Sequence, residues 1–146
     1  MGQRSVNKGA SLHLPPRDVS FVVASRAPFA KIERFKRRMG WRFKWVSSAG
    51  TDFNNDLGVS ITPDQVQRGA MLYNYTTTNA GMPDREGASV FYKDRSGAVF
   101  HTYSCYARGI EMLNGTYHVL DLVPNGRDED PDDPFSWVRY HDRYQD

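Results

Sequence analysis

The 146-residue sequence predicts an α/β fold with a mixed sheet that ends in a β-hairpin and a helix. Residues 18–25 form a near-continuous apolar, β-branched run, which is typical of a strand buried on both faces of a mainly parallel sheet. An amphipathic helical pattern follows over 28–39, and two strand patterns flank a turn at 94–97. A parallel strand, a crossover helix and a hairpin together define this fold class.

Length and composition are those of one domain, with 39% hydrophobic and 25% charged residues and a net charge of +2. Pro15 and Pro16 end a short pattern at 11–14, so we expect a disordered or irregular segment over 1–17 and a single domain over 18–146. The sequence has neither a run of eighteen apolar residues nor a signal-peptide stretch, which predicts a cytoplasmic protein without membrane contact.

The helix predicted over 28–39 has clear boundaries. Pro28 suits the first turn, and Gly40 ends the pattern. The residues on its apolar face recur at helical spacing, whereas basic residues occupy the other face and crowd the last turn, where they complement the helix dipole. The apolar positions are Phe29, Ile32, Phe35 and Met39.

Aromatic and basic residues alternate over 41–48, which predicts a half-buried or edge strand. The same basic and aromatic stretch, 34–45, is also consistent with stacking on single-stranded nucleic acid. A loop over 49–58 follows, and Thr62, Pro63 and Gln65 form a capping box that starts a short helix ending near Arg68. Residues 73–85 are polar and suit a long surface connection.

The hairpin predicted next pairs 88–93 with 98–103 in antiparallel orientation. Beyond it, apolar residues at helical spacing indicate a helix from Ala107 to Leu122. This order of elements corresponds to the back half of a thioredoxin-like domain, with the usual first strand and helix missing. That strand would lie between 19–25 and 88–93, so its absence leaves backbone groups unpaired on both.

Three explanations fit these unpaired backbone groups: the two strands pair directly, another chain fills the gap, or the sequence is a fragment. Because exposed edges promote association, we expect a homodimer formed through them, with strand exchange as one route.

Nine short motifs carry a family resemblance from about residue 12 onward. They are RDVSFVVASRAP (17–28), RMGW (38–41), WVSS (45–48), DFN (52–54), SVFY (89–92), HTYS (101–104), YARG (106–109), LNGTY (113–117) and GRDED (126–130). In this order they resemble the thioredoxin-like family called domain of unknown function 899, whose members are labelled predicted dithiol-disulfide oxidoreductases. Similar members place a Cys-x-x-Cys pair upstream of the match to Leu12, where this chain has Gly2 to Ser11 and no cysteine. The resemblance therefore implies the fold but not the dithiol chemistry.

Cys105 is the one thiol of the chain, and it lies at a strand-to-helix junction beside His101. Positive charge and a helix start favour thiolate, so Cys105 with His101 as base is the candidate catalytic pair. The alternative is that Cys105 is a partly buried, unreactive small side chain. The histidines show no metal-ligand spacing, and a glycine-rich phosphate loop is absent, so we predict no metal and no cofactor.

Polar residues also gather at the ends of predicted strands, where open α/β sheets bind ligands. We expect two ligand-binding sets, the first being Arg26, Trp45, Ser47 and Asp52 and the second His101, Tyr103, Cys105 and Arg108. The alternative is that both arginines pair with carboxylates such as Asp52 and Asp121 and only fix loops.

These observations predict a binding or interaction domain without dithiol activity. A small anionic ligand or a protein partner would be held through Arg26 and Arg108. A single-thiol redox enzyme using Cys105 is the first alternative, and nucleic-acid binding through 34–45 is the second.

Overall fold

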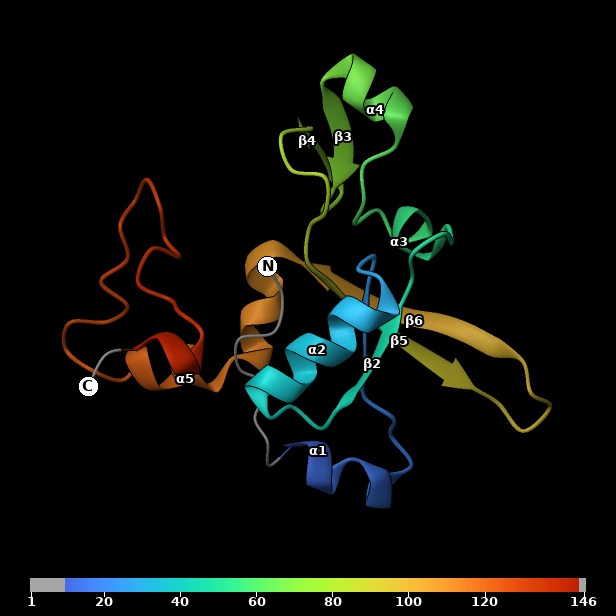
Figure 1. Cartoon of the computed structure of the whole chain (residues 1–146), viewed down its shortest axis with the longest axis horizontal. Helices are drawn as coiled ribbons and strands as arrows, with labels where there is room; N and C mark the ends of the chain where they lie inside the picture. Colours follow the sequence, from blue (N-terminus) through green and yellow to red (C-terminus); the bar gives the residue numbers. More distant parts are fainter. Residues whose placement is uncertain (1–9, 145–146) are drawn as a thin grey trace. The chain divides into compact units, whose positions relative to one another are not determined.

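The structure is a computed structural model that describes residues 10–144, and it has a mixed α/β architecture (Figure 1). The described chain divides into two compact units, one of residues 51–111 and the other of residues 10–50 and 112–144. The predicted single domain over 18–146 stays a prediction, and the part of the predicted irregular segment before residue 10 lies outside the described residues.

In the unit of 10–50 and 112–144, two short helical turns, α1 (Ala10–His13) and η1 (Pro15–Arg17), precede strand β1 (Val22–Ser25). β1 pairs in parallel with β2 (Lys44–Ser47), in a register that places Val23 opposite Trp45. Only Val23 of β1 is buried, whereas Val22 is 43% exposed. The prediction that this strand is buried on both faces was therefore wrong, because a two-stranded sheet offers little cover.

Helix α2 (Phe29–Met39) joins the two parallel strands and packs against β2 (Figure 1). It begins directly after Pro28 and ends at Gly40, whose φ of 62° is the left-handed conformation that glycine adopts without strain. Ile32 and Met39 are buried, with 1% and 4% of their surface exposed. The predicted helix and its boundaries are confirmed.

The helix predicted from Ala107 to Leu122 is broken in two. A 3-10 helix, η2 (Ala107–Leu113), precedes the short helix α5 (Gly115–Leu120). Asn114 separates them, because its side chain accepts a hydrogen bond from the Thr116 amide at 3.1 Å and caps α5. A last 3-10 turn, η3 (His141–Arg143), lies near the end of the chain.

The unit of residues 51–111 begins with α3 (Phe53–Asp56) and α4 (Pro63–Arg68), and α4 has the predicted capping box. Strands β3 (Ala70–Tyr73) and β4 (Thr76–Asn79) then form an antiparallel hairpin where a surface connection was expected. Its two turn residues, Asn74 and Tyr75, have φ values of 51° and 61°, which suit a two-residue hairpin turn. Ile61, Met71 and Tyr73 form the core beneath it.

The second hairpin of this unit consists of β5 (Gly87–Lys93) and β6 (Val99–Tyr106), which confirms the antiparallel prediction and extends it (Figure 1). The register shifts between Val90 and Phe91, which pair with Tyr103 and His101. Thr102 is thus an extra residue on β6, and this bulge turns the side chains beyond it. At the tip, Asp94 accepts hydrogen bonds from the amides of Ser96 and Ala98 at 2.8 and 3.0 Å.

The six strands form three separate two-stranded sheets within residues 10–144. This confirms the predicted α/β class with its antiparallel hairpin, since β1 bonds to β2 in parallel and β5 bonds to β6. The single mixed sheet of a thioredoxin-like domain stays a prediction. Within the same residues, the longest helices are too short and too polar to cross a bilayer.

Candidate functional site

The loop from β1 to α2 carries Arg26 and is fixed by two residues of β2. Trp45 Nε1 donates a hydrogen bond to Ser25 Oγ at 3.0 Å, and Ser47 Oγ donates to the Ala27 carbonyl at 2.7 Å. These bonds bracket Arg26 on both sides. Two residues of the first predicted ligand-binding set, Trp45 and Ser47, therefore hold the loop that carries a third, Arg26, at the carboxyl end of β1.

Arg26 also lies two residues before Pro28, the N-cap of α2. This helix end has neither a side-chain cap nor an acidic residue in its first turn. The first amides of a helix carry its partial positive charge, so anions are stabilised there. Arg26 is half-buried. Its guanidinium adds a full positive charge to the loop before this helix end.

Asp52, the fourth residue of the first predicted set, belongs to the other unit. It is the N-cap residue of α3, and its carbonyl accepts the Asp56 amide at 2.8 Å. Asp52 therefore begins α3 in this structure.

The bulge in the β5–β6 hairpin divides the second predicted set between two faces. Tyr103 and Cys105 are two residues apart on β6 and share one face. His101 lies beyond the extra residue and hydrogen-bonds to Ser104, which points to the opposite face. The structure therefore does not pair His101 with Cys105 as base and nucleophile.

Cys105 instead has a phenol for a neighbour. The hydrogen bond between Tyr103 and the Cys105 thiol is the main reason that the pKa of Tyr103 is raised, and the charge interaction with Cys105 adds to it. Cys105 itself is half-buried.

A chain of hydrogen bonds occupies the other face of the hairpin, and no sequence pattern predicted it. His101 Nε2 lies 2.7 Å from Ser104 Oγ, which lies 2.7 Å from Ser89 Oγ on β5. The His101 ring stacks on Phe91 at 5.1 Å between centroids. Since His101 Nε2 is also 3.1 Å from the Tyr103 carbonyl, the imidazole is held in place along the strand.

Arg108, the last member of the second set, forms an ion pair with Glu111 at 3.0 Å, one helical turn further along. Asp121, named above as a possible partner for an arginine, pairs with Arg127 at 2.6 and 2.8 Å. Arg108 is 52% exposed, so its charge is largely screened by solvent.

The aromatic residues of the basic and aromatic stretch pack on one another. Ring centroids of Trp41, Phe43 and Trp45 lie 5.4 to 6.1 Å apart. Phe35 of α2 contacts Trp41 and Trp45 edge-on at 5.5 and 6.1 Å. The rings thus hold the helix to the strand, which is the structural interpretation of this pattern.

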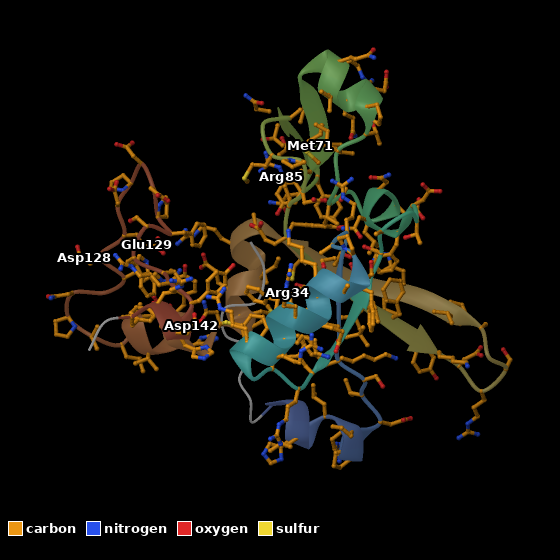
Figure 2. The ribbon with its side chains drawn as sticks, viewed as in Figure 1. Arg34, Met71, Arg85, Asp128, Glu129 and Asp142 are labelled. Carbon is orange, nitrogen blue, oxygen red and sulfur yellow. The ribbon has the colours of Figure 1, made fainter. Side chains whose placement is uncertain are left out.

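A second aromatic group, in the unit of 51–111, was not predicted. The Arg85 guanidinium, on the segment leading to β5 (Figure 2), lies 5.0 Å from the ring centroid of Tyr73. Tyr73 in turn contacts Tyr106 edge-on at 5.7 Å.

The part of the chain that the structure describes contains no group of three or more histidine, cysteine, aspartate or glutamate side chains placed to hold a metal ion.

A family model described as a bacterial protein of unknown function (DUF899) matches residues 4–144, almost the whole chain. Neither a curated protein nor a solved structure matches.

Proposed function

The chain belongs to the DUF899 family of bacterial proteins of unknown function, and we propose that it is a thioredoxin-like binding domain that takes a small oxyanion at the Arg26 loop and does not exchange dithiols. Dithiol exchange needs an attacking thiolate and a second, resolving thiol. This chain has a single cysteine, so it has no resolving thiol of its own.

The observation that carries the binding proposal is the anchoring of the Arg26 loop. The Trp45–Ser25 and Ser47–Ala27 hydrogen bonds fix this loop at the carboxyl end of β1, directly before the N-terminus of α2. Ligands of open α/β sheets bind beyond the carboxyl ends of parallel strands, and helix N-termini favour negative charge. A fixed arginine at that position adds the charge that an oxyanion needs. Arg108 is not part of this loop and forms an ion pair with Glu111.

The test is titration of the protein with inorganic phosphate, followed by amide chemical shifts. We expect saturable shifts of the amides of residues 26–31, and about a tenfold loss of affinity in Arg26→Gln, since a charged hydrogen bond contributes roughly 1.5–3 kcal/mol. Arg42→Gln is the matched control, because Arg42 is an exposed arginine outside the loop. Equal binding by both variants, or shifts that do not include residues 26–31, would overturn the proposal.

A single-thiol redox function is the second candidate, favoured by the hydrogen bond between Tyr103 and Cys105. The thiolate would attack hydrogen peroxide to give sulfenic acid at Cys105 and release water after protonation. Peroxide consumption that is lost in Cys105→Ser and reduced in Tyr103→Phe would support it. Activity that survives Cys105→Ser eliminates it, as does alkylation of Cys105 no faster than a small free thiol.

A further inference from the structure

A cavity of about 210 Å³ lies within the unit of 10–50 and 112–144. Its wall comes from three segments: the end of α2 with Trp41, the start of α5, and residues 137–144. Met39 closes it from α2 and is 4% exposed. None of the residues predicted as ligand-binding from the sequence lines this space.

Aromatic rings dominate the lining and are held by contacts behind them. Tyr140 packs edge-on against Phe35 of α2, with 5.3 Å between ring centroids. Trp137 contacts the ring of the buried Tyr117 in the same way at 6.2 Å. Tyr144 Oη accepts a hydrogen bond from the Arg139 amide at 3.1 Å. The segment is thus fixed before any ligand arrives, which lowers the entropic cost of binding.

The polar side chains of the lining include hydrogen-bond donors and the cation Arg139, beside Asn114 and Thr116. The Trp137 indole N–H is buried and has no hydrogen-bond partner within the described residues. A buried donor without a partner is costly, so such a group in a cavity wall favours a ligand with an acceptor. Arg139 and His141 also line the cavity, whereas aspartate and glutamate do not.

We infer that this cavity binds a planar aromatic carboxylate. The ring would lie among the aromatic side chains, and the carboxylate would accept the Trp137 indole N–H and face the Arg139 charge. Aromatic rings favour edge-on and offset contact with other rings, which a flat ligand provides and a bulky aliphatic one does not. This site is built from residues other than those of the Arg26 loop, so it goes beyond the proposed function.

Calorimetric titration with three probes of similar size tests the ligand class. Benzoate has both a planar aromatic ring and a carboxylate charge. Benzamide lacks the charge, and cyclohexanecarboxylate lacks the planar ring. We expect saturable benzoate binding with a Kd of about 1 mM or tighter, and at least about tenfold weaker binding of the other two. Equal affinity for all three, or no saturable benzoate binding, would overturn the inference.

Two variants locate the binding. Trp137→Phe removes the N–H and keeps a ring, and Arg139→Gln removes the charge, so each should weaken benzoate binding about tenfold. Arg143→Gln is the matched control, because Arg143 lies in the same segment without lining the cavity. We expect its affinity for benzoate to change less than twofold.

Near-ultraviolet circular dichroism of each variant shows whether the aromatic packing is retained. If Trp137→Phe alters that packing, Arg139→Gln decides the outcome. Arg139 is exposed, and substitution of an exposed residue usually changes the stability of the fold little. Wild-type affinity in a folded Arg139→Gln protein would overturn the site.

Discussion

Arg38 and Asp142 form a two-point ion pair that joins residues 104 positions apart. Arg38 Nε donates to Asp142 Oδ2 at 2.7 Å, and Arg38 Nη2 donates to Asp142 Oδ1 at 3.0 Å. The Arg38 guanidinium also lies 5.8 Å from the ring centroid of Tyr140. Figure 2 shows Asp142 near the end of α2, where this pair connects η3 to the helix. The aromatic cavity depends on a segment that this contact holds.

Acid should release this segment. The hydrogen bond from Arg38 is the main reason that the pKa of Asp142 is lowered. A lowered folded-state pKa means that the pair stabilises the fold above the unfolded value of about 3.9 and that this contribution is lost as pH falls through the folded pKa. We expect amide exchange in 137–144 to accelerate sharply below about pH 4 relative to the intrinsic rate.

Asp142→Asn separates this pair from general acid unfolding. The variant keeps the side-chain shape but lacks the charge, so rapid exchange in 137–144 should be present already at pH 7. Asp132→Asn is the control, since it changes a carboxylate ten residues earlier that forms no ion pair with α2 within the described residues. Slow exchange in Asp142→Asn at pH 7 would show that the aromatic contacts alone hold the segment.

Tyr73 provides a second prediction, on stability. Its hydroxyl donates to the Glu86 carbonyl at 2.8 Å and accepts the Ala107 amide at 2.8 Å, and its side chain is 7% exposed. Burial raises the pKa of this phenol, so it stays protonated at neutral pH. Tyr73→Phe leaves both backbone groups without their partner, and we expect a loss of roughly 1–3 kcal/mol in denaturant unfolding.

Tyr75→Phe is the matched control for that measurement. Tyr75 is 80% exposed and contacts Tyr106 through its ring, which phenylalanine keeps. Its unfolding free energy should change by less than about 0.5 kcal/mol. Equal effects of the two substitutions would contradict the role given to the Tyr73 hydroxyl.

The elements predicted correctly from the sequence are those whose signals are local. Pro28 and Gly40 mark the ends of α2, and the Thr62 capping box starts α4. The hairpin turn at 94–97 is stabilised by Asp94, whose pKa is lowered mainly by the Ser96 hydroxyl. Such features depend on neighbouring residues, so a pattern search can find them.

The missed features depend on single departures from a pattern or on distant contacts. Asn74 and Tyr75 form a tight turn without glycine, so β3–β4 resembled a polar loop. The extra residue Thr102 moves His101 away from Cys105, which strict alternation cannot show. Trp41 and Trp137 line the same cavity although they are far apart in the sequence, and no local pattern indicates this.

Association through strand edges remains a prediction with a direct test. Within residues 10–144, β1 pairs only with β2, which leaves one edge of β1 open. We expect light scattering to show a dimer. Val22→Lys should yield monomer, because charge on an edge strand opposes pairing, while Val66→Lys on α4 should stay dimeric. A monodisperse wild-type monomer would contradict the prediction.

Nucleic-acid binding by the stretch 34–45 makes the last prediction. Side chains that stack on bases need free ring faces, yet Trp41, Phe43 and Trp45 contact one another. The basic residues nearby, such as Arg34 on α2 (Figure 2), remain exposed and can attract phosphate only weakly. We therefore expect little binding of a fluorescent oligothymidylate at 200 mM salt, measured by anisotropy.

The salt dependence and one substitution decide the matter. A true site with about six phosphate contacts would lose roughly 300-fold in affinity for this single strand between 50 and 200 mM salt. It would also weaken in Trp45→Phe, a change that removes the indole N–H bonded to Ser25 and part of the stacking surface. Tight binding with that salt dependence, together with weaker binding in Trp45→Phe, would show that these rings bind nucleic acid as well as stabilise the fold.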